Sequence, residues 1–224
     1  MMKVEKFVFN EWQENCFLAY DETKEAVIID CGAHSQREFE RLTYYVERMG
    51  LKPVAQLCTH LHLDHIFGTQ MVLDKWGLAP IAGAADAFLV EQWSMISTMF
   101  GMPGEPQPPM PGKYMSQGDA IRFGNSVLKV LETPGHSPGS LCFYSKSDNI
   151  LFSGDVLFNY GVGRSDLPGG NGQQLYNSIA SQLFTLPDET KVYCGHGPET
   201  TIGDEKFGNP FISLCLTLCN RAAT

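Results

Sequence analysis

Three histidines and one aspartate fall within six consecutive positions of the sequence, at His60, His62, Asp64 and His65. Imidazole nitrogens and carboxylate oxygens are the ligands that zinc and iron take at neutral pH. A single His-x-His pair is often a solvated strand end, but packing alone gives no reason for four such groups to gather after the apolar run at residues 54–58. If that run is a strand, His60 and His62 point to the same side, and the other two residues follow where the chain turns into a helix. One short segment could therefore serve two adjacent metal ions.

Further candidate ligands stand directly after other strand-like runs. They are His136 in a Gly-His-Ser-Pro-Gly turn, Asp155 after residues 150–154, and His196 after residues 192–195. Each follows a glycine, and small residues of this kind suit a crowded site at strand ends. Five of the six histidines then belong to one set, and His34 is assigned no chemistry. Cys58 and Cys194 each lie two residues before a candidate ligand, and we expect both to be packing residues.

Two blocks of alternating elements must position these side chains. Strands are expected at residues 3–10, 15–20, 25–30, 54–58, 120–123, 126–131, 140–144, 150–152 and 191–193, with a shorter one near residue 81. Helices are expected at residues 35–49, with Ser35 as N-cap and Gly50 as C-cap, and at 68–76, 84–98 and 173–184. This order predicts an α/β layered fold in which two packed β-sheets are covered by helices. The Pro-, Gly- and Met-rich loop at residues 101–111 is either a surface connector or a wall over the site.

Length and composition indicate how many domains the chain has and which kinds of partner it can bind. The 224 residues predict one domain spanning residues 1–224. The net charge of −9 argues against a general nucleic-acid or anionic-membrane surface, although bound cations would reverse the field locally and permit an anionic small-molecule substrate. The chain shows no signal-peptide core and no run long enough to cross a bilayer, so we expect a cytoplasmic protein. Seven cysteines without a Cys-x-x-Cys pair indicate reduced thiols.

The combination of Thr-His-Leu-His-Leu-Asp-His at residues 59–65 with Gly-His, Gly-Asp and Gly-His pairs further on resembles the metallo-β-lactamase superfamily. Within it, the chain is similar to short, single-domain glyoxalase II-like (hydroxyacylglutathione hydrolase-like) enzymes. The resemblance implies a four-layer αββα sandwich with the site at one edge of the sheets, and two zinc ions, with iron or manganese as substitutes at either position. The implied ligands are His60, His62 and His136 for the first ion, Asp64, His65 and His196 for the second, and Asp155 as a bridge between the ions.

The implied chemistry is attack on a carbonyl by a hydroxide that the two cations make available at neutral pH. Asp64 and Asp155 are then the catalytic carboxylates; Asp64 is foremost a ligand, and a second role for it in proton handling stays open. Serine-type catalysis is disfavoured, because Ser137 lies near a ligand but no separate His-Asp pair remains to activate it.

The substrate is expected to contact Arg164, which matches a basic residue that contacts the glutathione part of a thioester in glyoxalase II proteins. Asp166 stands where those enzymes commonly have an aromatic residue, and the alternative to substrate contact is that Arg164 and Asp166 pair with each other. Only 28 residues follow His196, in place of the helical domain of full-size glyoxalase II. Their apolar run at residues 211–216 could form one short helix that packs on the core or at the interface of a homodimer.

Other functions remain as alternatives. The segment at residues 163–166 also resembles persulfide dioxygenases, which bind one iron, here through His60, His136 and Asp155. The sequence at residues 195–201 looks more like the hydrolases, which we therefore favour. A non-catalytic metal module would need a closed coordination shell, which nothing in the sequence predicts. A β-lactamase would be expected to have a signal sequence and commonly a cysteine at the position of Asp155, and a nuclease would need a basic surface or an added domain.

Overall fold

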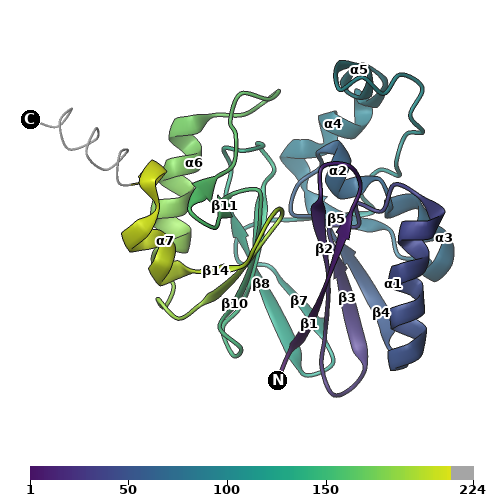
Figure 1. The fold of residues 1–224 in the computed structure, drawn as a ribbon, viewed down its shortest axis with the longest axis horizontal. Helices are drawn as coiled ribbons and strands as arrows, with labels where there is room; N and C mark the ends of the chain where they lie inside the picture. Colours follow the sequence, from purple (N-terminus) through teal and green to yellow (C-terminus); the bar gives the residue numbers. More distant parts are fainter. Residues whose placement is uncertain (213–224) are drawn as a thin grey trace, which may run out of the picture.

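Two six-stranded sheets pack against each other in a computed structural model that describes residues 1–212 (Figure 1). The first sheet has the order β1 (Lys3–Phe9), β2 (Glu14–Tyr20), β3 (Glu25–Ile29), β4 (Lys52–Leu57), β5 (Pro80–Gly83) and β6 (Lys113–Met115). The second has the order β14 (Thr200–Thr201), β13 (Lys191–Cys194), β10 (Ile150–Gly154), β9 (Leu141–Ser145), β8 (Ser126–Glu132) and β7 (Ala120–Phe123). A small hairpin, β11 (Leu157–Phe158) with β12 (Gly161–Val162), follows β10 in the chain.

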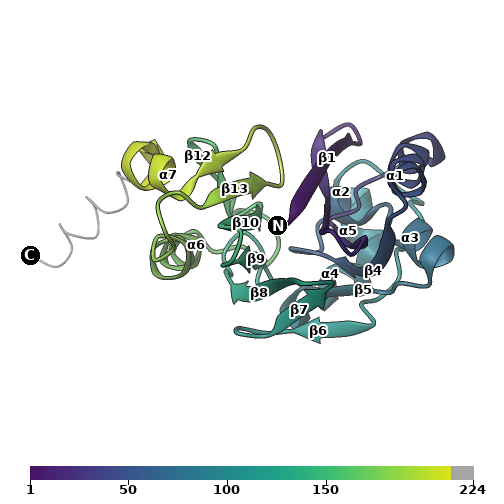
Figure 2. The same cartoon turned by 90° about the horizontal axis from the view of Figure 1, so that it is seen from below.

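Helices cover the outer face of each sheet, which gives the four-layer αββα sandwich (Figures 1 and 2). On the first sheet lie α1 (Gln36–Met49) and α3 (Thr69–Trp76), and on the second lie α6 (Gly172–Ser178), η2 (Ile179–Leu183) and α7 (Ile202–Gly208). Short elements α2 (Leu63–Ile66), η1 (Ala84–Asp86), α4 (Ala87–Glu91) and α5 (Trp93–Met99) lie at one edge. The predicted fold class is confirmed.

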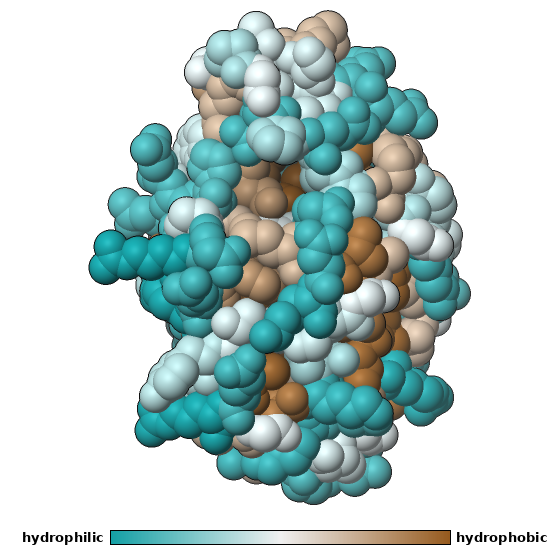
Figure 3. Space-filling view, turned by 90° about the vertical axis from the view of Figure 1, so that its right-hand side faces the viewer, coloured by the Kyte–Doolittle hydropathy of each residue, from teal (hydrophilic) through white to brown (hydrophobic). Residues whose placement is uncertain are grey.

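The layers form because each element has one apolar face. In β8, Leu128 and Val130 are buried between the sheets whereas Lys129 between them is exposed, as the two-residue period of a strand requires. The inter-sheet core is rich in aromatic side chains, with Phe152 5.5 Å from Phe17 between ring centroids. The face that carries α1 and α3 shows mostly polar side chains, with apolar residues between them (Figure 3).

We expect the Phe152→Ala variant to lose about 3–5 kcal/mol of unfolding free energy, because it removes a fully buried ring between the sheets. Denaturant unfolding followed by circular dichroism measures the change. The matched control is Phe207→Ala, in which the ring removed is 79% exposed and the expected change is within about 0.5 kcal/mol. Equal losses in the two variants would contradict this description of the core.

The helix caps were predicted correctly. Ser35 and Glu38 form a capping box at the start of α1, and Gly50 ends it with φ +61°. Two predicted helices differ in the structure. Residues 84–98 form three short helices in place of one, because the chain changes direction at Gln92, where φ is −99° and ψ is 22°. This bend lets apolar residues on both sides of it pack into one cluster. The helix expected at residues 173–184 passes into π-helical geometry at Ile179.

Two pairs of parallel strands deliver the candidate ligands to one edge. β3 runs parallel to β4, so the ends of both strands meet where residues 58–65 begin. β10 runs parallel to β13, so Asp155 and His196 follow adjacent strand ends in the second sheet. Parallel pairing therefore explains why candidate ligands far apart in sequence gather at one place.

The loop at residues 101–111 connects α5 to β6 without a helix or strand of its own. It is held in place by Trp93, whose indole N–H donates to the Glu105 carbonyl at 2.9 Å, and by His34, whose Nε2 lies 3.1 Å from Glu105 Oε1. Of the apolar run expected at residues 211–216, Ile212 is buried against the helices of the second sheet, and residues 213–216 lie outside the described part. Within residues 1–212, no helix combines the length and apolarity that a membrane span needs.

Candidate metal centre

Three histidines form the first candidate ligand group. His60 and His62 follow β4, and His136 lies in the loop between β8 and β9, so the group joins the two sheets. Nε2 of His136 lies 3.2 Å from Nε2 of His60 and 2.8 Å from Nδ1 of His62. All three side chains are buried. Ring nitrogens that face one another this closely need a shared proton or a cation between their lone pairs, which is the arrangement of a metal site.

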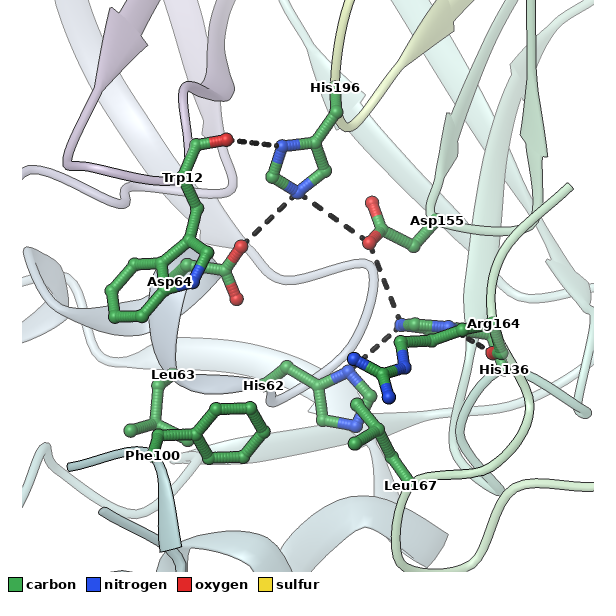
Figure 4. Close-up of a pocket in the computed structure, with 10 residues that line it drawn as sticks. All are labelled: Trp12, His62, Leu63, Asp64, Phe100, His136, Asp155, Arg164, Leu167 and His196. Atoms are coloured by element: carbon green, nitrogen blue, oxygen red, sulfur yellow. Dashed lines mark hydrogen bonds and ion pairs between the residues drawn. The ribbon is translucent and has the colours of Figure 1, made fainter. Parts of the chain in front are cut away.

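A second group lies beside the first. Asp64 and His65 belong to α2, which begins just after the His-x-His pair, and His196 follows β13. Nε2 of His196 lies 3.1 Å from Asp64 Oδ2 and 3.3 Å from His65 Nε2. Asp64 and His196 point toward each other in the close-up of the cavity (Figure 4), and the ligand atoms of all three residues lie within 4.8 Å of one another.

Asp155 lies between the two groups. Its Oδ1 is 3.3 Å from His65 Nε2, and its Oδ2 is 3.6 Å from His196 Nε2 and 3.7 Å from His136 Nε2 (Figure 4). One carboxylate thus faces both groups, as a bridging ligand would. The Asp155 carboxylate lies so close to the backbone at position 195 that only glycine fits there, because a Cβ would lie 2.2 Å from Asp155 Oδ1.

The second ring nitrogen of several histidines is held by an acceptor. Nδ1 of His136 donates to the Arg164 carbonyl at 2.7 Å, and Nδ1 of His196 donates to the Trp12 carbonyl at 3.0 Å. Because a carbonyl can only accept, both rings carry their hydrogen on Nδ1 when neutral, and Nε2 is left for a metal. Nδ1 of His65 lies 3.1 Å from Asp30 Oδ2 and is oriented in the same way.

Burial keeps His60 and His62 of the first group neutral. Desolvation, followed by the nearby charge of His136, lowers the pKa of His62 to about 3. The pKa of His60 is likewise held well below its usual value, first by burial and then by neighbouring histidines. These two rings therefore offer lone pairs at neutral pH without losing a proton.

The second group is charged. Burial alone would lower the pKa of His65, but the fields of Asp155 and Asp64 outweigh burial and raise this pKa well above its usual value. The pKa of His196 is raised for the same reason, since its hydrogen bond to Asp64 and the charge of Asp155 exceed the cost of burial. The pKa values of both carboxylates are lowered, despite burial, chiefly by His65. A metal entering this group must displace protons.

The donor set fits two divalent cations. Each group offers three ligands of zinc or iron type within 4.8 Å of one another, and Asp155 faces both. Asp30 also lies close to His60 and His65, but we assign it a supporting role and not that of a ligand. Its carboxylate already accepts hydrogen bonds from the backbone N–H and the hydroxyl of Thr59, at 2.7 Å each. The cysteines next to the ligands are not part of the set, since burial raises the pKa of Cys194 to about 12.

A cavity of about 270 Å³ opens onto the two groups. Trp12, Leu63 and Phe100 form one wall and Leu167 lies opposite, beside Arg164 (Figure 4). The walls are therefore apolar and the floor consists of candidate ligands. Phe100, directly before the 101–111 loop, lines the cavity, whereas none of residues 101–111 is among the lining residues.

Arg164 and Asp166 pair with each other. Nε and one terminal nitrogen of the guanidinium each donate to a different carboxylate oxygen, both at 2.7 Å. Both side chains are more than half exposed. Arg164 lines the cavity, whereas Asp166 is not among the lining residues. The structure thus brings Arg164 to the site and gives Asp166 the role of its partner.

Sequence reasoning missed Trp12, which supplies both a cavity wall and the acceptor for His196. It lies in the four-residue turn between β1 and β2, where Asn10 donates to the carbonyl oxygens of Gly32 and Asp64 at 2.9 and 2.8 Å. A tryptophan in a turn, away from any apolar periodicity, was the available signal. Asp30, a charged residue at the end of a buried strand, gave a similar signal.

A family profile described as "Metallo-beta-lactamase superfamily" matches residues 9–196. The chain is 35% identical over 215 residues to hydroxyacylglutathione hydrolase GloC of Haemophilus influenzae, covering 95% of this chain and 99% of that protein.

Among the solved structures similar to this chain are three with at least 29% identity. BLEG-1 B3 metallo-beta-lactamase has a TM-score of 0.85 and 34% identity, with 94% of this chain and 100% of that chain covered. TTHA1623 in a di-iron-bound form has a TM-score of 0.81 and 36% identity, with 92% and 99% covered. ETHE1 from Myxococcus xanthus has a TM-score of 0.78 and 29% identity, with 94% and 84% covered. The match to the family profile, the four-layer fold and the two groups of candidate ligands agree: the chain belongs to the metallo-beta-lactamase superfamily.

Proposed function

We propose that the chain is a dinuclear metal-dependent hydrolase that cleaves a thioester or a related ester. The observation that carries the proposal is the position of Asp155, whose Oδ2 lies 3.7 Å from His136 Nε2 of the first group and 3.6 Å from His196 Nε2 of the second, while its Oδ1 lies 3.3 Å from His65 Nε2. A carboxylate in this position serves two ions more naturally than one. The similarity to a hydroxyacylglutathione hydrolase supports the thioester as the substrate class.

Two bound ions, zinc in our proposal, would make a hydroxide available at neutral pH and would stabilise the oxyanion that forms from the carbonyl. The protein's own residues hold the ligands in place and move protons. Asp64 is 20% exposed and lines the cavity, so it can pass a proton between the site and the departing thiol. His60 and His62 of the first group stay neutral, as ligands must.

The cavity favours an acyl group with an apolar part. Its walls are Trp12, Leu63, Phe100 and Leu167, and its one lining guanidinium already has a carboxylate partner. Since an exposed ion pair is weak, Arg164 could still exchange Asp166 for a substrate carboxylate at small cost. We therefore propose Arg164 as a substrate contact and Asp166 as the residue that orients it.

We expect Trp12→Ala to lower kcat/KM for a thioester about tenfold, mainly through KM, because it removes an apolar wall and keeps the backbone carbonyl that holds His196. Steady-state kinetics measure the change. The control is Tyr114→Ala on β6, since the two side chains are equally exposed, at 41% and 42%, and Tyr114 does not line the cavity. A tenfold loss in both variants would contradict the assignment of the cavity.

A mononuclear iron oxidoreductase is the second candidate, because residues 163–166 resemble persulfide dioxygenases; the similarity to ETHE1 from Myxococcus xanthus is compatible with it. That reading uses His60, His136 and Asp155 alone. It leaves the second group, with its two histidines and Asp64, without a chemical role. We therefore favour the dinuclear hydrolase.

Assays of the purified protein on S-lactoylglutathione and on glutathione persulfide distinguish the two candidates. Thioester cleavage without oxygen uptake supports the hydrolase, and oxygen uptake with the persulfide supports the oxidoreductase. A β-lactam is included as a third substrate because BLEG-1, a B3 metallo-beta-lactamase by its name, is similar to this chain. Turnover of the β-lactam alone would overturn the proposed substrate class.

A further inference from the structure

Asp86 is a fully buried carboxylate that lies outside the candidate ligand set. It stands at the end of η1 and accepts three hydrogen bonds, from the Leu61 N–H at 3.1 Å, the Ser137 hydroxyl at 2.7 Å and the Gly139 N–H at 2.5 Å. One oxygen takes the first two and the other oxygen takes the third. Both oxygens therefore act as acceptors, which is the hydrogen-bonding pattern of an ionised carboxylate.

These three donors belong to the two segments that carry the first ligand group. Leu61 lies between His60 and His62, which follow β4 of the first sheet. Ser137 directly follows His136 in the loop between β8 and β9 of the second sheet. The Asp86 carboxylate thus connects the two segments across the boundary between the sheets.

We propose that Asp86 is a positioning residue that sets the metal affinity of the first ligand group by fixing its two segments to each other. The inference rests on the proposed function, because it requires that this group binds a metal ion. Asp86 touches neither a ligand nitrogen nor the cavity, so it acts through the backbone of the ligand segments. The Asp86 carboxylate also lies close to three imidazole ligands, and an anion at this position favours a cation between them.

The backbone at Gly139 packs closely against both Asp86 and Gly83. A Cβ at Gly139 would lie 2.7 Å from Asp86 Oδ1, and a Cβ at Gly83 would lie 2.1 Å from the Gly139 carbonyl oxygen. Ser140 extends the network, since its hydroxyl lies 2.8 Å from that of Ser137. The loop that carries His136 is therefore packed directly against Asp86, and a change in the carboxylate is passed to the ligand.

An asparagine at position 86 keeps the shape of the side chain and removes one acceptor. Its amide must face either the Gly139 N–H or the pair formed by Leu61 and Ser137, and two donors then meet in a buried site. Supporting residues of this kind change metal affinity about 10- to 100-fold when they are replaced.

The experiment isolates the first group by using the His196→Ala background, in which the second group has lost a ligand. Zinc affinity of the metal-free protein is measured by competition with a chromophoric chelator, and thermal unfolding is recorded for the same samples. We expect Asp86→Asn in this background to raise the zinc dissociation constant about 10- to 100-fold. Ser137→Ala, which removes one donor and keeps the carboxylate, should raise it about threefold to tenfold and serves if Asp86→Asn does not fold.

Asp21→Asn is the matched control. Asp21 is also a buried carboxylate that joins the sheets, since it accepts from Thr23 beside β3 and from Asn125 and Ser126 beside β8. It does so at the end of β3 opposite to the ligands. This variant should lower the unfolding temperature. It should leave the zinc dissociation constant within about threefold of the background, because Asp21 is far from the first ligand group and substitutions at distant sites act independently.

The outcomes separate the inference from the function on which it rests. An unchanged dissociation constant in Asp86→Asn, or an equal increase in Asp21→Asn, would overturn the positioning role. Failure of the unmutated protein to bind zinc would overturn the proposed function itself.

Discussion

Replacing Asp155 with alanine is expected to lower kcat/KM for thioester hydrolysis about 10³-fold or more. The side chain faces both ligand groups, so its loss disturbs both ions and the nucleophile between them. Such electrostatic stabilisation is worth several kcal/mol, and each 1.36 kcal/mol corresponds to about tenfold in rate. Activity at saturating metal, measured beside the far-ultraviolet circular dichroism spectrum, separates a catalytic effect from unfolding.

The fold should survive this change because Asp155 lies at the end of β10, outside the inter-sheet core. His62→Ala should behave in the same way, with a folded protein and loss of activity. The control is Asp188→Ala, which removes an exposed carboxylate paired with Lys206 and should keep full activity. Full turnover in Asp155→Ala or His62→Ala would contradict the dinuclear assignment.

The second large effect concerns pH. The pKa of His65 is raised well above its usual value and that of His196 is also raised, so His65 carries a second ring proton in the metal-free protein at neutral pH, which it must lose to bind a metal. Metal binding to the second group therefore releases protons, and affinity must fall as pH falls below these raised pKa values. With the His65 proton displaced, the affinity of the second group should drop at least about tenfold from pH 7 to pH 6.

The first group should respond much less over the same range. The pKa of His62 is lowered to about 3 and that of His60 is also lowered, so neither ring has to release a proton there. Calorimetric titration with zinc in buffers of different ionisation enthalpy counts the protons released at each step. Two binding steps with the same pH dependence would show that the charges of the two groups are wrongly assigned.

The candidate ligands could be predicted from the sequence because their signal is local. His60, His62, Asp64 and His65 are adjacent in the chain, and the other three each follow a glycine at the end of a strand-like run. Parallel pairing of β3 with β4 and of β10 with β13 then brings the ends of these strands together. The caps of α1 were predictable for the same reason, since Ser35 and Gly50 act within a few residues of the chain.

What the sequence could not supply depends on contacts between distant segments. Trp12 holds His196 across 184 positions, through its backbone carbonyl rather than its side chain. From the sequence, Asp86 is predicted only as a helix residue. Its contacts with Leu61 and Ser137, which lie in loops from different sheets, are seen only in the structure. The pairing of Arg164 with Asp166 was one of two alternatives, and only the geometry chooses between them.

The bend at Gln92 has a similar origin. The apolar residues on both sides of it follow one helical period, so local propensity favours a single helix. Packing around Leu61 and Leu63 instead stabilises two short helices, α4 and α5, on either side of Gln92, because each can then bury its own apolar face. Tertiary packing overrides propensity at this position.

Metal analysis of the purified protein tests the central claim most directly. After unbound ions are removed, the protein is quantified together with its zinc, iron and manganese content by mass spectrometry. The seven-residue site predicts two transition-metal ions per chain, falling to one in His196→Ala. A single iron per chain that is retained in full by His196→Ala would contradict the dinuclear site and support the alternative that uses His60, His136 and Asp155.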